Sequence, residues 1–279
     1  MLLEKIKLLT LKALMHDEKL MYGLVLKGGN ALQLVYDITD RASMDIDFSI
    51  EGDFTELDYQ RISGTLDALL NDEFQKENLI VFDIRFIEKP KTNKVKVWKG
   101  YNIEFKVAHK DNWFIDDIDK TRREAIKILG QSTKFSIDIS SFEYIASAKK
   151  HDLDGTVLMV YTPEMIVIEK LRALCQSIPE YQEIITTAKI KGRARDFYDI
   201  WNICNQFPID IASPQNLLLI KEIFKAKRVP ISFLKLLDGY RDLQKENWKS
   251  VEDTLGSENN GFDFYFDYVM KLVGQIKNL

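Results

Sequence analysis

Residues 27–50, KGGNALQLVYDITDRASMDIDFSI, decide the fold of this chain. The apolar run before them, residues 21–26, predicts a strand that ends at the glycine pair. The apolar-rich residues 31–36 predict a helix after that turn. Residues 45–50 then alternate polar and apolar side chains with period two, which indicates a half-buried strand. The stretch therefore predicts a strand, a glycine turn, a helix and a second strand with acidic residues on one face.

The glycine pair and the acidic strand together favour phosphate and metal chemistry. A turn at Gly28 and Gly29 lets backbone amides approach a phosphate closely, and the N-terminus of the following helix favours negative charge. Asp45 and Asp47 lie two residues apart on a strand, so both point to one side and can hold cations of the Mg²⁺ type. Two such ions about 4 Å apart can clamp the attacking and leaving oxygens of a phosphoryl displacement. Each motif alone is common in ordinary turns and solvated strands, so the prediction depends on their occurrence in this order.

The rest of the chain changes character near residue 160. Before it, residues 79–88 and 134–140 predict further strands, a strand pair is expected within 94–108, and a polar helix within 111–129. After it the pattern is helical, beginning with a helix that Thr162 can cap and that has Pro163 at its first position. We therefore expect a mixed domain over residues 1–160 and a helical domain over residues 161–279.

Composition indicates a folded protein whose cysteines are reduced. Hydrophobic residues make up 46% of the 279 residues and charged residues 29%, close to globular averages. The two cysteines lie far apart in apolar patterns, which favours a cytoplasmic setting. Charged residues interrupt the N-terminal apolar run, so it predicts an amphipathic helix and no membrane association. The net charge of −4 means that a polyanionic partner must meet a local basic patch.

The motifs resemble a known family once they are taken together. The pattern from Lys27 to Leu32, followed by Arg41-x-Ser43-x-Asp45-Ile-Asp47, is similar to the first motif of the AbiEii/AbiGii toxin family within the DNA polymerase β-like nucleotidyltransferases. The resemblance implies an α/β (α+β) fold with a mixed sheet flanked by helices, followed by a helical C-terminal domain. It also implies that Gly28, Gly29 and Asn30 bind nucleotide, although Asn30 replaces the small hydroxyl residue often found beside the glycines.

Three later residues resemble further site positions of this family. Asp138 resembles a third carboxylate, which would share a metal ion with Asp45 and Asp47 and help to deprotonate the attacking hydroxyl. Lys170 resembles the active-site lysine that binds the triphosphate, and Asp196 an acid near the nucleotide or acceptor. From the residues alone, Asp138 fits a solvated strand face equally well, and the Lys170 ammonium can either extend from the core margin or point into a cleft.

Ordinary ion pairs within one turn of helix also explain the acids near residue 196. Asp199 is expected to be structural and to pair with Arg172 or Arg195.

The resemblance implies a nucleotidyltransferase that uses Mg²⁺ (or Mn²⁺) and transfers a nucleoside monophosphate from an NTP to a hydroxyl. It further implies the toxin of a type IV toxin-antitoxin, or abortive infection, system, with a separate antitoxin protein and tRNA as acceptor. RNA is expected to dock on the basic, aromatic segment 189–201 and on the helical C-terminal half. Two alternatives stay open: transfer to a small molecule such as an aminoglycoside, and an inactive nucleotide-binding or interaction module.

Overall fold

The computed structural model describes residues 2–38, 45–90, 95–128, 132–255 and 259–276. The chain divides into two compact units. Unit 1 comprises residues 1–36, 42–145 and 149–160, and unit 2 comprises residues 37–41, 146–148 and 161–279. Arg41 and Ser43, which belong to the motif quoted above, lie outside the described residues.

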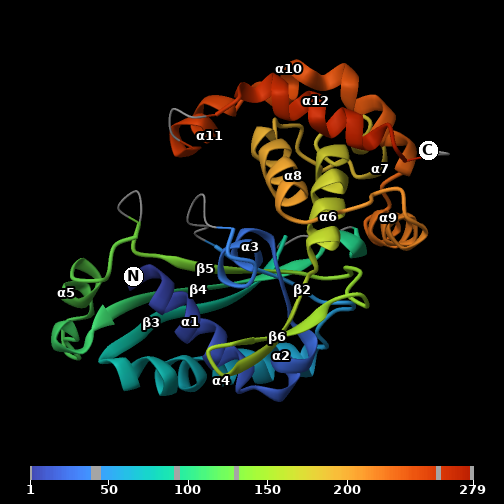
Figure 1. Cartoon of the computed structure of the whole chain (residues 1–279). Coiled ribbons are helices and arrows are strands. Elements are labelled where there is room, and N and C mark those ends of the chain that lie inside the picture. The colour runs from blue at the N-terminus through green and yellow to red at the C-terminus, as the bar shows by residue number, and fades with distance from the viewer. Residues whose placement is uncertain (1, 39–44, 91–94, 129–131, 256–258, 277–279) are drawn as a thin grey trace. The chain divides into compact units, whose positions relative to one another are not determined.

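Unit 1 is built on a seven-stranded mixed sheet with the order β3-β4-β5-β2-β1-β7-β6 (Figure 1). Two neighbouring pairs, β2 with β5 and β1 with β7, are parallel, and the remaining pairs are antiparallel. The strands are β1 (Val25–Lys27), β2 (Ile46–Ser49), β3 (Leu79–Lys89), β4 (Gly100–His109), β5 (Phe135–Ser140), β6 (Lys149–Leu153) and β7 (Thr156–Val160). This confirms the expected mixed α/β class.

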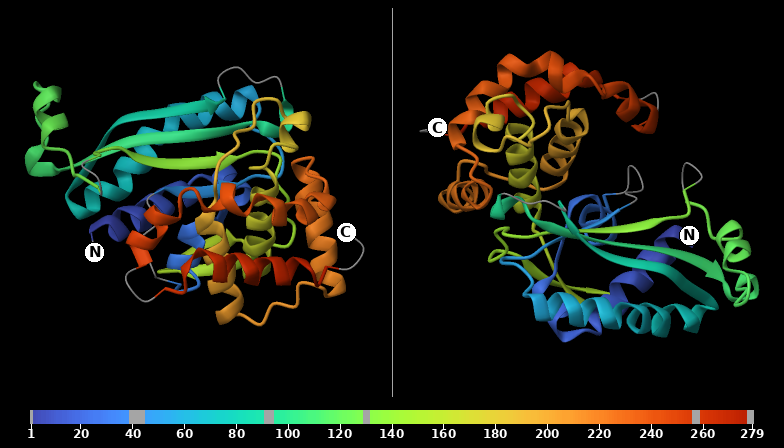
Figure 2. Two further views of the ribbon diagram at one scale, coloured as in Figure 1. Left: turned by 90° about the horizontal axis from the view of Figure 1, so that it is seen from above. Right: turned by 180° about the vertical axis from the view of Figure 1, so that it is seen from behind.

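Helices lie on both faces of this sheet (Figures 1 and 2). Helices α1 and α4 pack together along one face, where Phe74 of α4 meets Phe105 of β4 edge to face. Helix α3 lies on the other face beside β1 and β2. The helices of unit 1 are α1 (Leu2–Met15), α2 (Glu18–Gly23), α3 (Gly28–Leu34), α4 (Glu56–Phe74) and α5 (Ile118–Arg123), with 3-10 turns η1 (Gln75–Glu77), η2 (Lys96–Trp98) and η3 (Lys110–Asn112).

Local capping explains where two of these helices begin. Thr55 accepts from the backbone N–H of Asp58, and the Asp58 side chain accepts in return from the Thr55 backbone, so α4 begins with a complete capping box. Asp17 accepts from the backbone N–H of Leu20 and so begins α2. The strand predicted from residue 21 therefore starts only at Val25, because residues 21–23 belong to α2.

Two other predictions for unit 1 were wrong. The region 94–108 contains one described strand, β4, preceded by η2, and no strand pair in its described part. The long helix expected within 111–129 is reduced to η3 and α5. Trp113 and Ala125 instead pack against Phe82 and Ala108 of the sheet, and this burial outweighs the helical pattern of the segment.

Unit 2 is helical, and α6 lies at its centre. Thr162 caps α6 and Pro163 occupies its first turn, as predicted. The apolar side chains of α6 are buried on all sides, which is typical of a helix surrounded by others. The helices are α6 (Pro163–Cys175), α7 (Tyr181–Ile184), α8 (Ala194–Gln206), α9 (Pro214–Ala226), α10 (Arg241–Lys245), α11 (Trp248–Leu255) and α12 (Gly261–Val273), with the 3-10 segment η5 (Ile231–Tyr240).

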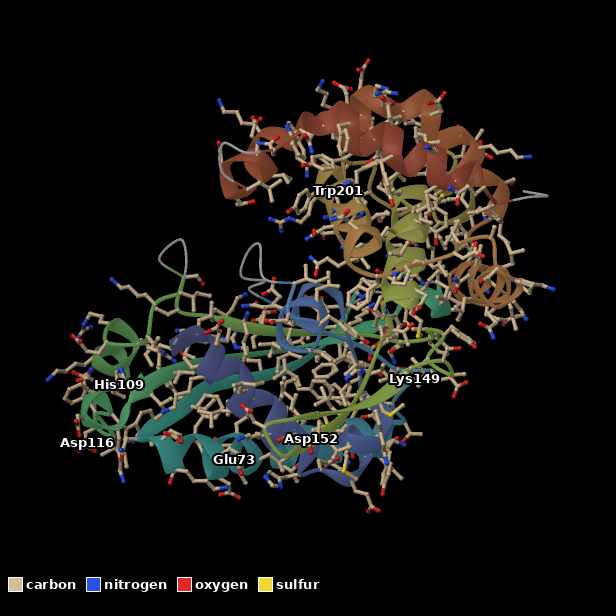
Figure 3. All side chains as sticks on the ribbon, viewed as in Figure 1. Glu73, His109, Asp116, Lys149, Asp152 and Trp201 are labelled. Atoms are coloured by element: carbon tan, nitrogen blue, oxygen red, sulfur yellow. The ribbon has the colours of Figure 1, made fainter. Side chains whose placement is uncertain are left out.

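Aromatic packing joins α8 to α12 in unit 2. Phe197 stacks on Phe266 with ring centroids 5.1 Å apart, and both side chains are fully buried. Trp201, labelled in Figure 3, meets Tyr265 and the half-exposed Phe264. The C-terminal aromatic segment is therefore mainly core. No helix in the described part of the chain is long and apolar enough to cross a membrane.

Candidate active site

Four polar residues form a row across the sheet of unit 1. Lys27 of β1 pairs with Asp47 of β2, Asp47 pairs with Asp138 of β5, and Asp138 pairs with Asn102 of β4. Residues paired across neighbouring strands point to the same face. Asp47 and Asp138 are therefore adjacent carboxylates on one face of the sheet. The predicted site residues of unit 1 are thus brought together, from segments far apart in the sequence.

The glycine turn lies directly against this row. Gly28 has φ of +65°, in the left-handed region that favours glycine, and α3 begins there. A Cβ at Gly28 would stand 2.8 Å from Oδ2 of Asp47, closer than side-chain atoms approach. Gly28 therefore provides both the turn conformation and the room for the Asp47 carboxylate. Gly29 is half-buried in the first turn of α3.

Replacing Gly28 with alanine should displace the Asp47 carboxylate and impair the site. The positive φ costs about 1–2 kcal/mol of stability for a non-glycine residue. Gly155→Ala is a matched control, because Gly155 has φ of +78° and nothing within 4 Å of its Cβ position. Both variants should lose similar stability in urea unfolding, but only Gly28→Ala should also lose nucleotide binding, measured by calorimetry. Equal binding by the two variants would contradict this role of Gly28.

Asp45 precedes β2 and is held through its backbone. The fully buried side chain of Asn30 in α3 donates from Nδ2 to the carbonyl oxygen of Asp45. The amide of Asn30 thus connects α3 to the start of the acidic strand, and a contact from Asn30 to phosphate stays a prediction. Burial raises the pKa of the Asp45 carboxyl, and the negative charge of Asp138 raises it further, against smaller opposing effects of Lys89 and Lys134.

Removing the charge of Asp138 should therefore lower the pKa of Asp45. In an Asp138→Asn variant, burial still disfavours the Asp45 carboxylate but the like charge is gone, so its titration should move to lower pH. The shift can be followed by ¹³C NMR of the Asp45 carboxyl carbon. Glu88→Gln, which removes a β3 carboxylate paired with Lys99, serves as the control and should leave this titration unchanged. An Asp45 pKa that is insensitive to Asp138→Asn would show that the two carboxyls are not coupled.

The Asp138 carboxylate is approached by one hydrogen-bond donor and one cation. Asn102 Nδ2 donates to its Oδ1 at 2.8 Å, and Lys89 Nζ lies 3.7 Å from the same oxygen. The Asp138 side chain is 45% exposed, so it remains accessible to a ligand. Asn102 belongs to none of the sequence motifs. Its only signal there is a polar residue within an apolar strand, and its importance depends on the register of β4 and β5.

The glycine motif begins at Lys27 but does not predict the position of the Lys27 side chain. Its side chain is buried, and Nζ lies 3.3 Å from Ser140 Oγ and 3.6 Å from the carboxylate of Glu143, which is also buried. Removing one partner of a buried ion pair leaves an uncompensated charge, which is costly. The Lys27 ammonium therefore ties β1 to the end of β5 on the same face as Asp47 and Asp138.

The two carboxylates of this row fit a divalent cation that also binds water and phosphate oxygens. Among the described residues, no group of three or more His, Cys, Asp or Glu side chains is arranged to hold a metal ion. Mg²⁺ typically uses one or two protein carboxylates together with water and substrate phosphates. Asp47 and Asp138 are two adjacent carboxylates, and Asp45 is coupled electrostatically to Asp138. A metal bound here would be completed by the oxygens of its substrate.

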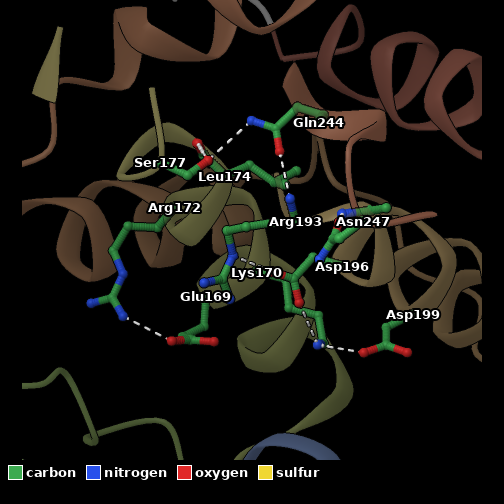
Figure 4. A network of polar contacts seen from close by, with 11 residues as sticks. Glu169, Lys170, Arg172, Leu174, Ser177, Arg193, Asp196, Asp199, Gln244 and Asn247 are labelled. Atoms are coloured by element: carbon green, nitrogen blue, oxygen red, sulfur yellow. Dashed lines mark hydrogen bonds and ion pairs between the residues drawn. The ribbon is translucent and has the colours of Figure 1, made fainter. Parts of the chain in front are cut away.

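Unit 2 contains a buried ion-pair network around Lys170 (Figure 4). Lys170 Nζ lies 2.9 Å from Asp196 Oδ1 and 2.6 Å from Asp199 Oδ2, and its side chain is only 9% exposed. Burial lowers the pKa of Lys170, but the two carboxylates outweigh this and raise it. Lys170 is therefore charged, and α6 and α8 meet through it.

The prediction of an arginine partner for Asp199 was wrong. Asp199 pairs with Lys170, whereas Arg172 binds Glu169 one turn earlier on α6. Helical spacing suggested Arg195, and Arg172 was the alternative from α6, but the packing of α8 against α6 brings Lys170 to Asp199.

The start of α8 is held by side chains from other parts of unit 2. The Arg193 guanidinium binds Asp196 at 2.5 Å. Gln244 accepts from the Arg193 backbone N–H, and Asn247 accepts from the Ala194 backbone N–H. Burial opposes the charge of Asp196, but Arg193 and Lys170 outweigh it and hold the pKa of that carboxyl below its usual range. Asp196 is therefore ionised and held by two cations.

Solved structures resemble this chain in fold. JHP933 from Helicobacter pylori aligns with a TM-score of 0.52 and 17% identity, over 98% of this chain and 89% of that chain. A proposed nucleotidyltransferase from H. pylori aligns with a TM-score of 0.52 and 16% identity, over 98% of this chain and 93% of that chain. At these identities the likeness concerns the fold alone. No curated protein matches the sequence significantly.

The family comparison covers nearly the whole chain. Residues 10–268 match the family described as "Nucleotidyl transferase AbiEii toxin, Type IV TA system". The matched region includes the glycine turn, the carboxylate row and the Lys170 network. The chain therefore belongs to the AbiEii nucleotidyl transferase toxin family.

Proposed function

We propose that this protein is a Mg²⁺-dependent nucleotidyltransferase that transfers a nucleoside monophosphate from an NTP to a hydroxyl of tRNA. The observation that carries the proposal is the pairing of Asp47 with Asp138 on one face of the sheet, directly beside the Gly28 turn. Two carboxylates next to a glycine turn combine metal binding with phosphate binding. Membership of the AbiEii family supports the same reaction class.

The residues of this chain have distinct roles in the proposed reaction. Mg²⁺, or Mn²⁺, would supply charge stabilisation for the transferring phosphoryl group; Asp47 and Asp138 would hold it, and Asp45 would join them once metal and substrate are bound. The backbone at Gly28, Gly29 and Asn30 binds the phosphates of the NTP. An acceptor hydroxyl oxygen attacks the α-phosphorus while Asp138 takes its proton, the bond from the α-phosphorus to the bridging oxygen breaks, and pyrophosphate leaves. Most of the acceleration comes from positioning and charge stabilisation.

By the motif order of the family, Lys170 and Asp196 take part in the same reaction. We assign Lys170 to the triphosphate and Asp196 to the nucleotide or acceptor. In the described structure the Lys170 ammonium binds two carboxylates, so a phosphate would compete with Asp196 and Asp199 for it. The negative charges of the two acids therefore weaken the attraction of Lys170 for a triphosphate.

The proposed acceptor is tRNA, and the proposed setting is a type IV toxin-antitoxin system with a separate antitoxin, working in the cytoplasm. Segment 189–201 supports an RNA acceptor, because Lys189 and Lys191 are exposed and Trp201, which packs on Tyr265, keeps part of its surface accessible. Exposed cations bind the RNA backbone, and aromatic side chains stack on unpaired bases.

Labelling each candidate acceptor tests the proposal. The protein is incubated with Mg²⁺, each α-³²P-labelled NTP, and either total tRNA or an aminoglycoside, beside an Asp45→Asn/Asp47→Asn variant. We expect label in tRNA that is absent with the variant and with EDTA. Label on the aminoglycoside alone would show that the acceptor is a small molecule and not tRNA. The absence of both transfer and pyrophosphate release with every acceptor would overturn the enzymatic proposal.

A further inference from the structure

Asn102 is a fully buried polar residue in the middle of β4. It pairs with Asp138 in the sheet register, so its side chain lies on the face that carries the carboxylate row. Buried polar side chains normally satisfy all their hydrogen-bonding groups, and those that do not have a specific explanation. Asn102 is such a case, because one end of its amide has several partners and the other end has none.

The hydrogen bonds of Asn102 are all made by its nitrogen. Nδ2 lies within bonding distance of three acceptors: Ser136 Oγ at 2.7 Å, Asp138 Oδ1 at 2.8 Å and the Ile137 carbonyl oxygen at 3.1 Å. Oδ1 is buried and has no hydrogen-bond partner in the described part of the chain. An unsatisfied buried acceptor lowers stability. The chain therefore bears a cost in order to keep the nitrogen of Asn102 directed at β5.

The opposite orientation of the amide would harm the carboxylate. Exchanging the nitrogen and oxygen of Asn102 would let Ser136 donate to Oδ1, but it would place that oxygen against Asp138 Oδ1. Two acceptors at hydrogen-bonding distance repel each other, most strongly when one is ionised. The observed orientation is thus the one in which the amide donates a hydrogen bond to Asp138.

We propose that Asn102 is a positioning residue for the metal and acceptor site, acting through the orientation of Asp138. The inference rests on the proposed function, because it assigns Asp138 to that site. In the described structure the hydrogen bond from Asn102 and the approach of Lys89 both fall on Oδ1 of Asp138. Oδ2 would then be the oxygen available to a metal ion or to the proton of the acceptor. Groups that orient metal ligands in this way typically contribute about 10–100-fold to metal affinity.

Asn102→Leu separates this role from a structural one. Leucine is close to asparagine in size, removes the donor to Asp138 and also removes the unsatisfied acceptor. Ser136 and Asp138 are partly exposed and can bond to water instead. We expect Mn²⁺ affinity, measured by electron paramagnetic resonance of the free ion, to fall about 10–100-fold. The thermal midpoint of the metal-free protein should stay the same or rise.

Asn71→Leu is the matched control. Asn71 of α4 donates to the Val81 carbonyl at 3.0 Å and accepts from the Val81 backbone N–H at 2.9 Å, at the edge strand and away from the carboxylate row. Its loss should lower the thermal midpoint and leave Mn²⁺ affinity unchanged. Asn102→Ser is a second variant that keeps the site polar, and it should show the same loss of Mn²⁺ affinity if the leucine variant does not fold.

The outcomes distinguish this inference from the proposed function. Wild-type Mn²⁺ binding together with weaker binding by Asn102→Leu or Asn102→Ser supports the role of Asn102. Equal affinity in the wild type and in the folded Asn102 variants overturns it and leaves the proposed function standing. A wild-type protein that neither binds Mn²⁺ nor transfers a nucleotide overturns both.

Discussion

Replacing Lys170 with methionine is expected to lower the free energy of unfolding by about 3–5 kcal/mol, the usual effect of removing one partner from a buried ion pair. Methionine keeps much of the length of the side chain but leaves Asp199 without its cation and Asp196 with Arg193 alone. Both carboxylates are largely buried, so water cannot replace the ammonium fully. Chemical unfolding monitored by circular dichroism measures the change.

The loss should depend on pH. In the wild type the pKa of Asp196 is depressed, so its stabilisation is present above the ordinary pKa of an aspartate and is lost as pH falls through the depressed value. The difference between wild type and Lys170→Met should thus be full near pH 7 and shrink in strongly acidic solution. A difference that is the same at both pH values would show that packing, and not the ion pairs, is what Lys170 contributes.

Two further variants complete this test. Lys225→Met, which removes a 75% exposed ammonium 4.0 Å from Glu222, should change stability by less than about 1 kcal/mol. Adding Asp199→Asn to Lys170→Met should recover part of the loss, because the unpaired charge is then gone. A loss of transfer activity by Lys170→Met bears on catalysis only under conditions where the variant is folded.

Asp138→Asn is expected to reduce nucleotidyl transfer by at least about 10²-fold, the lower range for loss of a general base. The asparagine side chain has nearly the same shape and still offers an oxygen to Asn102 Nδ2, so the fold should persist. It cannot take a proton from the acceptor hydroxyl. Initial rates of pyrophosphate release at saturating substrate measure the effect.

Glu104→Gln is the control for this substitution. Glu104 lies two residues from Asn102 on the same strand and face, and its partner is Lys134 at 3.0 Å. Removing its charge should leave the transfer rate close to that of the wild type, because the Glu104 carboxylate binds Lys134 and does not belong to the row of Asp47 and Asp138. Equal losses for Asp138→Asn and Glu104→Gln would mean that the general charge of this face matters, and would contradict a specific role for Asp138.

Local patterns predicted several elements correctly because they depend on neighbouring residues only. The alternation of residues 45–50 and 134–140 predicted β2 and β5, since side chains on a strand alternate between faces. Thr162 and Pro163 predicted the start of α6 through capping. The predictions failed where tertiary contacts outweighed local preference, as at Trp113, whose burial against Phe82 replaces most of a helix.

The features of the site also separate into those set by local sequence and those set by tertiary contacts. The sequence by itself determined that a glycine turn is followed by two acids at alternate positions, Asp47 in β2 and Asp45 just before it. It also determined that Asp138 lies on a polar strand face, because side chains on a strand alternate between faces. Only the tertiary structure placed Asp138 between Asp47 and Asn102 and paired Lys170 with Asp199. Strand register and helix packing join residues that are distant in the chain, and they are decided by the burial of whole faces and not by any local pattern.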